Sequence, residues 1–244
     1  ALLAHIAVSK VLDRQPLYHL EQKFEREFGW HISRSTMARW MIQIAEQCQP
    51  LINAMKEILL SYDIASIDAT ALQVLKEPSK KSQAYCMRGG PPEQEVTIYE
   101  YNAYAHKDYV DETLAGFQGI IHCDAEAVWS QVGQRSGIAL SYCHAHARRK
   151  FESIVKSGQK DGLAKQALQI YKTLYLIERE AKEKQMNAEE RFKLRLEKSK
   201  PIIDQFKNWL DAYSQKTLPK SPLGIAIRYC LNHWEGLIVF LTDG

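Results

Sequence analysis

The feature that most constrains the fold of this chain is a change in the spacing of its apolar residues. Over residues 1–61 apolar side chains recur every three or four positions, which is the period of a helix with one buried face. From residue 64 to residue 143 short runs rich in β-branched residues take over, and after Ala145 the helical period returns. This order predicts an α/β domain between two helical regions.

Five strands and one helix are expected in the middle of the chain. Gly89-Gly90-Pro91-Pro92 is a strong turn signal between the second and third strands. A helix from about Lys107 to Ala115 separates the third strand from the fourth. The expected strands cover residues 64–75, 83–88, 95–101, 119–124 and 138–143.

The order of these elements predicts the fold class. The expected order is three strands in a hairpin series, a helix, two further strands and then helices. This is the order of a ribonuclease-H-like α/β fold with a mixed five-stranded sheet. In that fold the first and fourth strands lie side by side and parallel. The expected domains are an N-terminal helical segment over residues 1–61, the ribonuclease-H-like core over 62–160 and a C-terminal helical region over 161–244.

The N-terminal segment has the outline of a helix-turn-helix. Its first long helix is stopped by Gly29, Ser35 is expected to cap the next helix, and Pro50 is expected to separate that helix from a third. In a helix-turn-helix, Arg34 and Arg39 would contact DNA phosphate. A plain helical hairpin explains the same pattern equally well.

Composition excludes several classes of protein. The chain is 45% hydrophobic and 25% charged, as an ordinary soluble globular protein is, and its net charge is only +3. Five scattered cysteines without a C-x-x-C pair argue against a disulfide framework and predict a reducing, cytoplasmic compartment. No apolar run approaches the ~20 residues that span a bilayer, and the first residues do not form a signal peptide.

Positive charge is concentrated after the last expected strand. Residues 143–200 carry 15 Lys and Arg against 8 Asp and Glu, whereas the rest of the chain carries 17 against 21. Because Arg148, Arg149 and Lys150 are consecutive, they fan over ~200° of a helix. Two of them are expected to contact DNA phosphate and the third to pair with Glu152. The later part of this stretch is expected to be a solvated helix surface.

Two aspartates each close a short apolar run. Asp68 follows Ile64-Ala65-Ser66-Ile67, and Asp124 follows the run that starts at Gly119. If these runs are the neighbouring first and fourth strands, which lie ~4.8 Å apart, both carboxylates can hold divalent ions spaced ~3.5–4 Å. Two such ions serve the in-line displacement of a phosphoryl group, and hard oxygen ligands suit Mg²⁺ or Mn²⁺.

Each aspartate also has a purely structural interpretation. Asp68 could end its strand and cap a turn with the hydroxyl of Thr70. Asp124 could cap the helix that runs through Glu126 and Trp129. Taken together in this strand order, the two aspartates favour the metal site.

Another kind of metal site deserves comparison. His122, Cys123, Cys143 and His146 are residue types that bind Zn²⁺. Their spacing is irregular and no C-x-x-C pair anchors it. Buried cysteines and hydrogen-bonded histidines are therefore favoured over zinc. His144 and His146 would share a face on a strand and diverge on a helix.

Several segments, in this order, match one known family. Asp68-Ala69-Thr70 lies in the first matching strand, Gly116-Phe117-Gln118-Gly119 leads to Asp124 in the second, and Cys143 to Phe151 is nearly a C-W-A-H-A-R-R-K-F motif. Together these segments resemble bacterial insertion-sequence transposases of the IS-sixty-six type. Further matches extend the resemblance over nearly the whole chain, at residues 15–18, 32–40, 72–75, 174–178, 220–223, 226–229, 234, 240–241 and 243–244.

The resemblance implies a DDE-type transposase that cleaves and transfers DNA strands at transposon ends. By that resemblance, Asp68 and Asp124 are the first two acids of a metal-binding triad, and the third, a glutamate, is expected beyond Gly244. A cysteine-rich region is expected before Ala1. The implied partners are Mg²⁺ or Mn²⁺, DNA and further copies of the chain, in a bacterial cytoplasm near the nucleoid.

The chain departs from the family pattern in three places. Ala69 replaces a glutamate, Ala125-Glu126 replaces Gly-Tyr and His144 replaces a tryptophan. These changes leave both aspartates in place. They also fit a second hypothesis, a non-catalytic DNA-binding or oligomerisation remnant of a transposase, whose DNA binding would depend on salt and need no metal.

Overall fold

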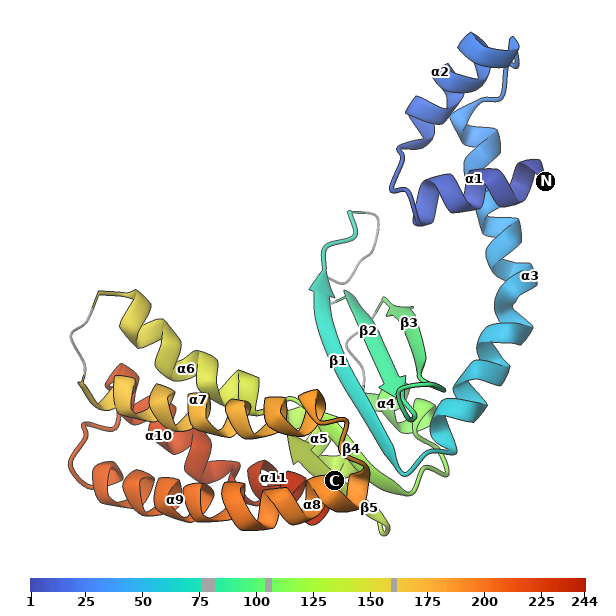
Figure 1. Ribbon diagram of the computed structural model, residues 1–244. Helices are drawn as coiled ribbons and strands as arrows, with labels where there is room; N and C mark the ends of the chain where they lie inside the picture. Colours follow the sequence, from blue (N-terminus) through green and yellow to red (C-terminus); the bar gives the residue numbers. More distant parts are fainter. Residues whose placement is uncertain (76–81, 104–106, 159–161) are drawn as a thin grey trace. The chain divides into compact units, whose positions relative to one another are not determined.

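The computed structural model describes residues 1–75, 82–103, 107–158 and 162–244 (Figure 1). The chain forms two compact units, Ala1–Ile58 and Leu59–Gly244. The first unit is helical, whereas the second contains a sheet and a layer of helices. Among the helices of the described ranges, none is long and apolar enough to cross a membrane.

The N-terminal unit contains two helices and most of a third. These are α1 (Leu2–Val11), α2 (Leu17–Phe28) and α3 (Arg34–Leu60). As predicted, Gly29 ends α2, where its φ of +66° is a left-handed conformation that glycine adopts without a steric penalty. One small core holds the unit together, and its buried side chains are Ile6, Leu20, Phe24 and Met37.

Two expectations for this unit are wrong. Ser33 rather than Ser35 caps α3, because the Ser33 hydroxyl accepts a hydrogen bond of 3.2 Å from the Thr36 amide. Pro50 does not separate two helices, since α3 continues through it. The fixed φ of proline, near −65°, lies in the helical range, so the helix can pass through a proline at the loss of one backbone hydrogen bond and some steric strain.

The second unit is built on a mixed five-stranded sheet in the order β3-β2-β1-β4-β5. β1 pairs with β2 antiparallel and with β4 parallel, which confirms the ribonuclease-H-like arrangement predicted from the sequence. The strands are β1 (Ile64–Leu72), β2 (Ser82–Gly89), β3 (Val96–Asn102), β4 (Gly119–Cys123) and β5 (Ile138–Tyr142). Two short helices accompany them, α4 (Lys107–Thr113) and α5 (Ala127–Val132).

β1 is longer than its partner β4. The two strands pair only from Ile64 to Ser66 of β1, while β1 continues beside β2 as far as Leu72. Asp68 therefore lies inside a strand, as the expected strand over residues 64–75 implies, and the alternative in which Asp68 ends its strand is wrong. The reason is that antiparallel pairing with β2 continues the strand after pairing with β4 has stopped.

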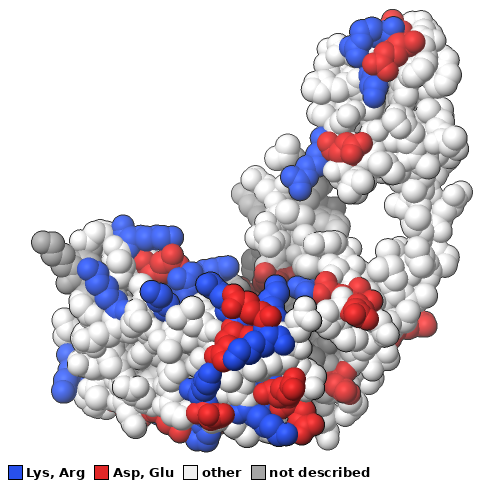
Figure 2. All heavy atoms as spheres, viewed as in Figure 1, with Lys and Arg blue, Asp and Glu red and all other residues white. Residues whose placement is uncertain are grey.

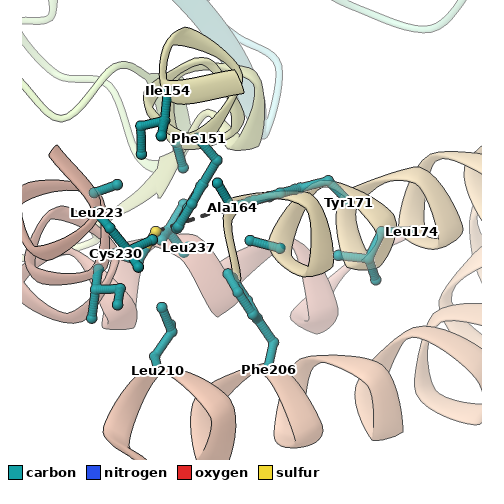
Figure 3. Close-up of a cluster of buried hydrophobic side chains, with 14 of the residues drawn as sticks. Phe151, Ile154, Ala164, Tyr171, Leu174, Phe206, Leu210, Leu223, Cys230 and Leu237 are labelled. Carbon is teal, nitrogen blue, oxygen red and sulfur yellow. Dashed lines mark hydrogen bonds between the residues drawn. The ribbon is translucent and has the colours of Figure 1, made fainter. Parts of the chain in front are cut away.

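A helical layer follows the last strand. It consists of α6 (His144–Lys156), α7 (Gly162–Glu183), α8 (Ala188–Leu194), a π-helical turn (Arg195–Ser199), α9 (Lys200–Ser214), α10 (Pro222–Asn232), α11 (Trp234–Ile238) and a 3₁₀ turn (Val239–Thr242). Figure 3 shows the core that these helices share, with Phe151 of α6, Tyr171 of α7 and Phe206 of α9 at its centre. All three side chains are fully buried.

The charged stretch after α7 is not merely a solvated surface. Arg195 is only 9% exposed and its guanidinium donates to Glu178 of α7 at 2.8 Å. The same guanidinium donates to the backbone carbonyls of Phe240 and Asp243, at 3.0 and 2.7 Å. Arg195 therefore ties the last described turn of the chain to α7.

Candidate metal centre

The sheet brings the two predicted aspartates side by side. Ser66 of β1 is paired with His122 of β4, and Asp68 and Asp124 each lie two positions further along the chain. Successive side chains of a strand alternate between its faces, which places Asp68 on the side of Ser66, and the carboxylate of Asp124 converges with that of Asp68. β4 ends at Cys123, and Asp124 follows it directly.

A histidine from the helical layer completes the group. One carboxylate oxygen of Asp68, one of Asp124 and a ring nitrogen of His146 all lie within 4.8 Å of one another. His146 is the third residue of α6, which starts immediately after β5. The sequence analysis placed His146 in a zinc set and missed this partnership. The signal that could have revealed it is its position in the first turn after the fifth strand.

Local hydrogen bonds orient the two carboxylates. The indole N–H of Trp129 donates to Oδ1 of Asp124 at 2.9 Å, and the Glu126 amide donates to the same oxygen at 3.3 Å. Oδ1 of Asp68 accepts from the amide of Ala69 at 3.1 Å. The second oxygen of each carboxylate lies outside these contacts, so both aspartates keep an oxygen for another ligand.

The imidazole of His146 has one nitrogen in use and one without a partner. Nε2 lies 3.2 Å from Nη1 of Arg149, and because a guanidinium can only donate, Nε2 accepts. Nδ1 is buried and has no hydrogen-bond partner among the residues that the structure describes. Leaving a buried polar atom unpaired costs about 1–3 kcal/mol. A ligand for the imidazole would remove this penalty.

The donor set fits a divalent cation. Two ligands of one Mg²⁺ at ~2.1 Å can be no more than ~4.2 Å apart, so a group within 4.8 Å needs only small side-chain shifts to share an ion. Carboxylate oxygens are hard ligands, and an imidazole nitrogen is a softer one. Both kinds of ligand occur in protein sites for divalent metals. With Nε2 accepting from Arg149, Nδ1 carries the proton of the neutral ring, so Nδ1 can bind an ion only after that proton has moved to Nε2 and the Arg149 contact has been released.

The negative charge of the site shifts the pKa values of neighbouring ionisable groups. Burial, then Asp124 and Asp68, raise the pKa of Glu126, while His146 acts in the opposite direction. Burial lowers the pKa of His122, and Asp68 offsets part of that shift. Two side chains from different elements therefore respond to the same pair of carboxylates.

The three predicted basic residues of α6 point to three different partners. Arg148 pairs with Glu152 at 3.1 Å. Arg149 contacts the imidazole of the site. The ammonium group of Lys150 lies 5.1 Å from the centre of the Tyr229 ring. Of the three, Arg149 is the one that the structure places against the candidate site.

Arg34 and Arg39 belong to the N-terminal unit and are exposed near the start of α3. The backbone amide of Arg34 donates to Glu21 of α2 at 3.1 Å, which fixes the link between the two helices. The guanidinium of Arg39 lies 3.5 Å from the Thr36 hydroxyl. Neither contact neutralises the positive charge of these arginines.

The alternative zinc set does not assemble. Within the described ranges, the group of Asp68, Asp124 and His146 is the one set of three or more potential ligands that converge. Cys123 is buried, and burial raises the pKa of its thiol, which disfavours the thiolate that zinc requires.

His144 and His146 diverge on α6, as expected on a helix. His144 points into the helical core, where its Nε2 lies 2.8 Å from the carbonyl oxygen of Leu237. Its ring meets Tyr171 and Phe240 edge to face. Burial lowers the pKa of His144 to about 4, so this ring is neutral at neutral pH. It is a packing residue with one hydrogen bond, a role that a tryptophan could also fill.

Comparisons with known proteins agree with this arrangement. The model of the family described as "Transposase IS66 family" matches residues 1–244. The uncharacterized proteins y4jD and y4qI of Sinorhizobium fredii are 30% and 33% identical to the chain over 262 and 258 residues. Each match covers 100% of this chain but 50% and 47% of the relative, so the chain spans about half their length. No solved structure gave a significant match.

Proposed function

This chain belongs to the Transposase IS66 family, and from that membership we propose that it is the core of a DDE-type transposase, which cleaves and joins DNA strands at transposon ends. The observation that supports the proposal most is the convergence of Asp68 and Asp124, fifty-six positions apart, with His146. A set of two carboxylates beside an imidazole is suited to hold Mg²⁺ or Mn²⁺. A bound divalent ion would supply electrostatic stabilisation of the reacting phosphate.

Several residues of the chain would bind or orient the ion at that site. Asp68 and Asp124 would bind the ion, and the indole of Trp129 would hold Asp124 in position through its hydrogen bond. His146 would add a third ligand through Nδ1, with its proton on Nε2 and the contact with Arg149 released. Ala69 contributes its backbone amide to Asp68, so the alanine that departs from the family pattern keeps that contact.

The DNA contacts of the enzyme are part of the same proposal. Arg149 would bind a phosphate next to the ion, since it already lies beside His146. Arg148 and Lys150 would extend the contact along α6, and Arg34 and Arg39 would contact DNA from the N-terminal unit. We further propose that the active form is a homo-oligomer in the bacterial cytoplasm, associated with the nucleoid.

Metal binding to this chain is the first test. Isothermal titration with Mn²⁺ should show a site whose affinity falls at least tenfold in Asp68→Asn and in Asp124→Asn, because each variant removes a charged ligand. Asp204→Asn is the control, since Asp204 is exposed on α9 and pairs with Lys200. His146→Gln should weaken Mn²⁺ more than Mg²⁺, because imidazole is the softer ligand. Equal affinity in all four variants would reject the site.

Strand cleavage is the second test. A polypeptide extended beyond Gly244, where the resemblance places the third acid, should nick transposon-end DNA only with Mg²⁺ or Mn²⁺. Asp68→Asn should abolish the nicking. Salt-dependent DNA binding without any metal-dependent nicking would favour the non-catalytic remnant instead.

A further inference from the structure

A groove lies between α6 and α7 and has a volume of about 540 Å³. One of the residues that line it, Tyr175, lies near enough to Arg149, which contacts His146, for the Arg149 charge to oppose the rise in the Tyr175 pKa. Figure 2 shows several Lys and Arg side chains over these two helices. The side chains that give the groove its character are Arg148 and Lys156 of α6 and Lys172, Tyr175, Leu176 and Arg179 of α7.

The charge of the groove is only partly compensated. Its one acidic side chain, Glu152, pairs with both Arg148 and Lys156 at 3.1 Å. Lys172 and Arg179 have no ion-pair partner among the residues that the structure describes. They are seven positions apart on α7, which is two turns or ~10.5 Å along one edge of the groove. Such a spacing suits contacts with phosphates of one strand.

An aromatic ring and an apolar side chain lie between these two cations. Tyr175 is 39% exposed and Leu176 is 46% exposed. Burial raises the pKa of Tyr175, against the effect of Arg148, so the phenol is neutral at neutral pH and does not repel an anion. Proteins bind single strands of nucleic acid with positively charged side chains placed around exposed aromatic rings, because every base can stack on a ring.

We propose that the α6–α7 groove binds a single strand of nucleic acid that leaves the candidate metal centre. Phosphates would contact Lys172 and Arg179, and a base would stack on Tyr175. Neighbouring packed helices have axes ~8–10 Å apart, so the groove between them is too narrow for a duplex, which is at least ~16 Å across because its two grooves are ~8.5 and ~7.5 Å deep. The part of this proposal that starts the strand at the metal centre rests on the proposed function, since that function has DNA cut at the site.

The test is the binding of a fluorescein-labelled oligothymidylate of about 12 nucleotides, a length within known single-strand site sizes, measured by fluorescence anisotropy. The buffer contains EDTA, so that the result does not depend on metal. The double variant Lys172→Ala, Arg179→Ala should bind at least tenfold more weakly. Its slope of log K against log salt concentration should be smaller by ~1.4, or ~0.7 for each lost phosphate contact. Tyr175→Ala should weaken binding about tenfold, and Tyr175→Phe should not.

Lys165→Ala, Lys182→Ala is the matched control, because it removes the same charge from exposed positions of α7 that do not line the groove. An equal loss in this control would overturn the proposal. So would a duplex of the same length that binds as tightly with the same dependence on Tyr175, or polyglutamate that competes as well as the unlabelled oligonucleotide. Mn²⁺ titration of the groove variants should match that of the unchanged chain, which keeps a failure here distinct from a failure of the metal site.

Discussion

Two faces of one helix, α6, show how differently the regions of this molecule use their side chains. One face carries Ala147, Phe151 and Ile154, which are buried in the helical core. Another carries His146 and Arg149, which lie at the candidate metal centre. The core face is apolar apart from His144, whereas the site face is polar and faces carboxylates.

This difference indicates where the stability of the unit comes from. Apolar burial in the helical layer provides stabilisation, and the strands and α6 carry the polar group into place. The metal centre itself gains little without an ion, because like charges and an unpaired nitrogen are unfavourable. Changes in the core should therefore reduce stability, while changes in the site should reduce ligand binding.

The largest expected effect is in the core. Phe151→Ala should lower the free energy of unfolding by about 4 kcal/mol, because it leaves a cavity among fully buried aromatic rings. Urea unfolding followed by circular dichroism measures this change. Leu218→Ala is the control, since Leu218 is 77% exposed, and it should change stability by less than ~0.5 kcal/mol. If Phe151→Ala lowered the free energy of unfolding by less than ~1 kcal/mol, the contrast between a stabilising core and a ligand-binding site would be wrong.

The next effect concerns His144, whose ring packs against the helical core. His144 is neutral in the folded chain with a pKa of about 4, against 6.5 for the ordinary group. The unfolded chain therefore binds a proton first as the pH falls, so stability is full above pH 6.5 and decreases down to pH 4. The shift corresponds to about 3 kcal/mol.

His144→Trp supplies the comparison for this titration. Tryptophan does not titrate, and its indole N–H can still donate to the Leu237 carbonyl. Carboxylates elsewhere titrate in both proteins, so the quantity to measure is the difference between the two curves of unfolding free energy against pH. Parallel curves between pH 7 and pH 4 would show that His144 is not buried as described.

The smallest change in the free energy of unfolding is expected at the metal centre, where a substitution can raise stability rather than lower it. In metal-free buffer Asp68→Asn should leave the unfolding free energy unchanged or raise it by at most ~1 kcal/mol, because it removes one of two neighbouring negative charges. Thermal unfolding in EDTA measures it. A loss of 2 kcal/mol or more would mean that Asp68 serves the fold rather than a ligand.

Much of this architecture could be predicted from local sequence signals. Alternating strands, the turn after Gly89 and the helix before Gly116 were sufficient for the order of the sheet. That order in turn placed the two aspartates on neighbouring strands. Ser221-Pro222 is a typical helix start, and Ser221 caps α10, since its hydroxyl accepts from the Gly224 amide at 3.1 Å.

Other features depend on packing between distant segments, which local patterns do not contain. The expected strand over residues 64–75 runs past Asp68, but nothing near Asp68 shows that β1 pairs with β4 only as far as Ser66. The role of His146 follows from where α6 starts relative to β1 and β4. Arg195 is buried because it meets Glu178 and the carbonyls of residues 240 and 243, which no helical period predicts.

The most direct measurement of the central claim is anomalous X-ray diffraction from crystals of this chain soaked in Mn²⁺. The account predicts a manganese peak bonded to Asp68, Asp124 and His146, and no peak there in crystals of Asp68→Asn. Well-ordered carboxylates with no manganese between them, or manganese bound only elsewhere, would contradict it.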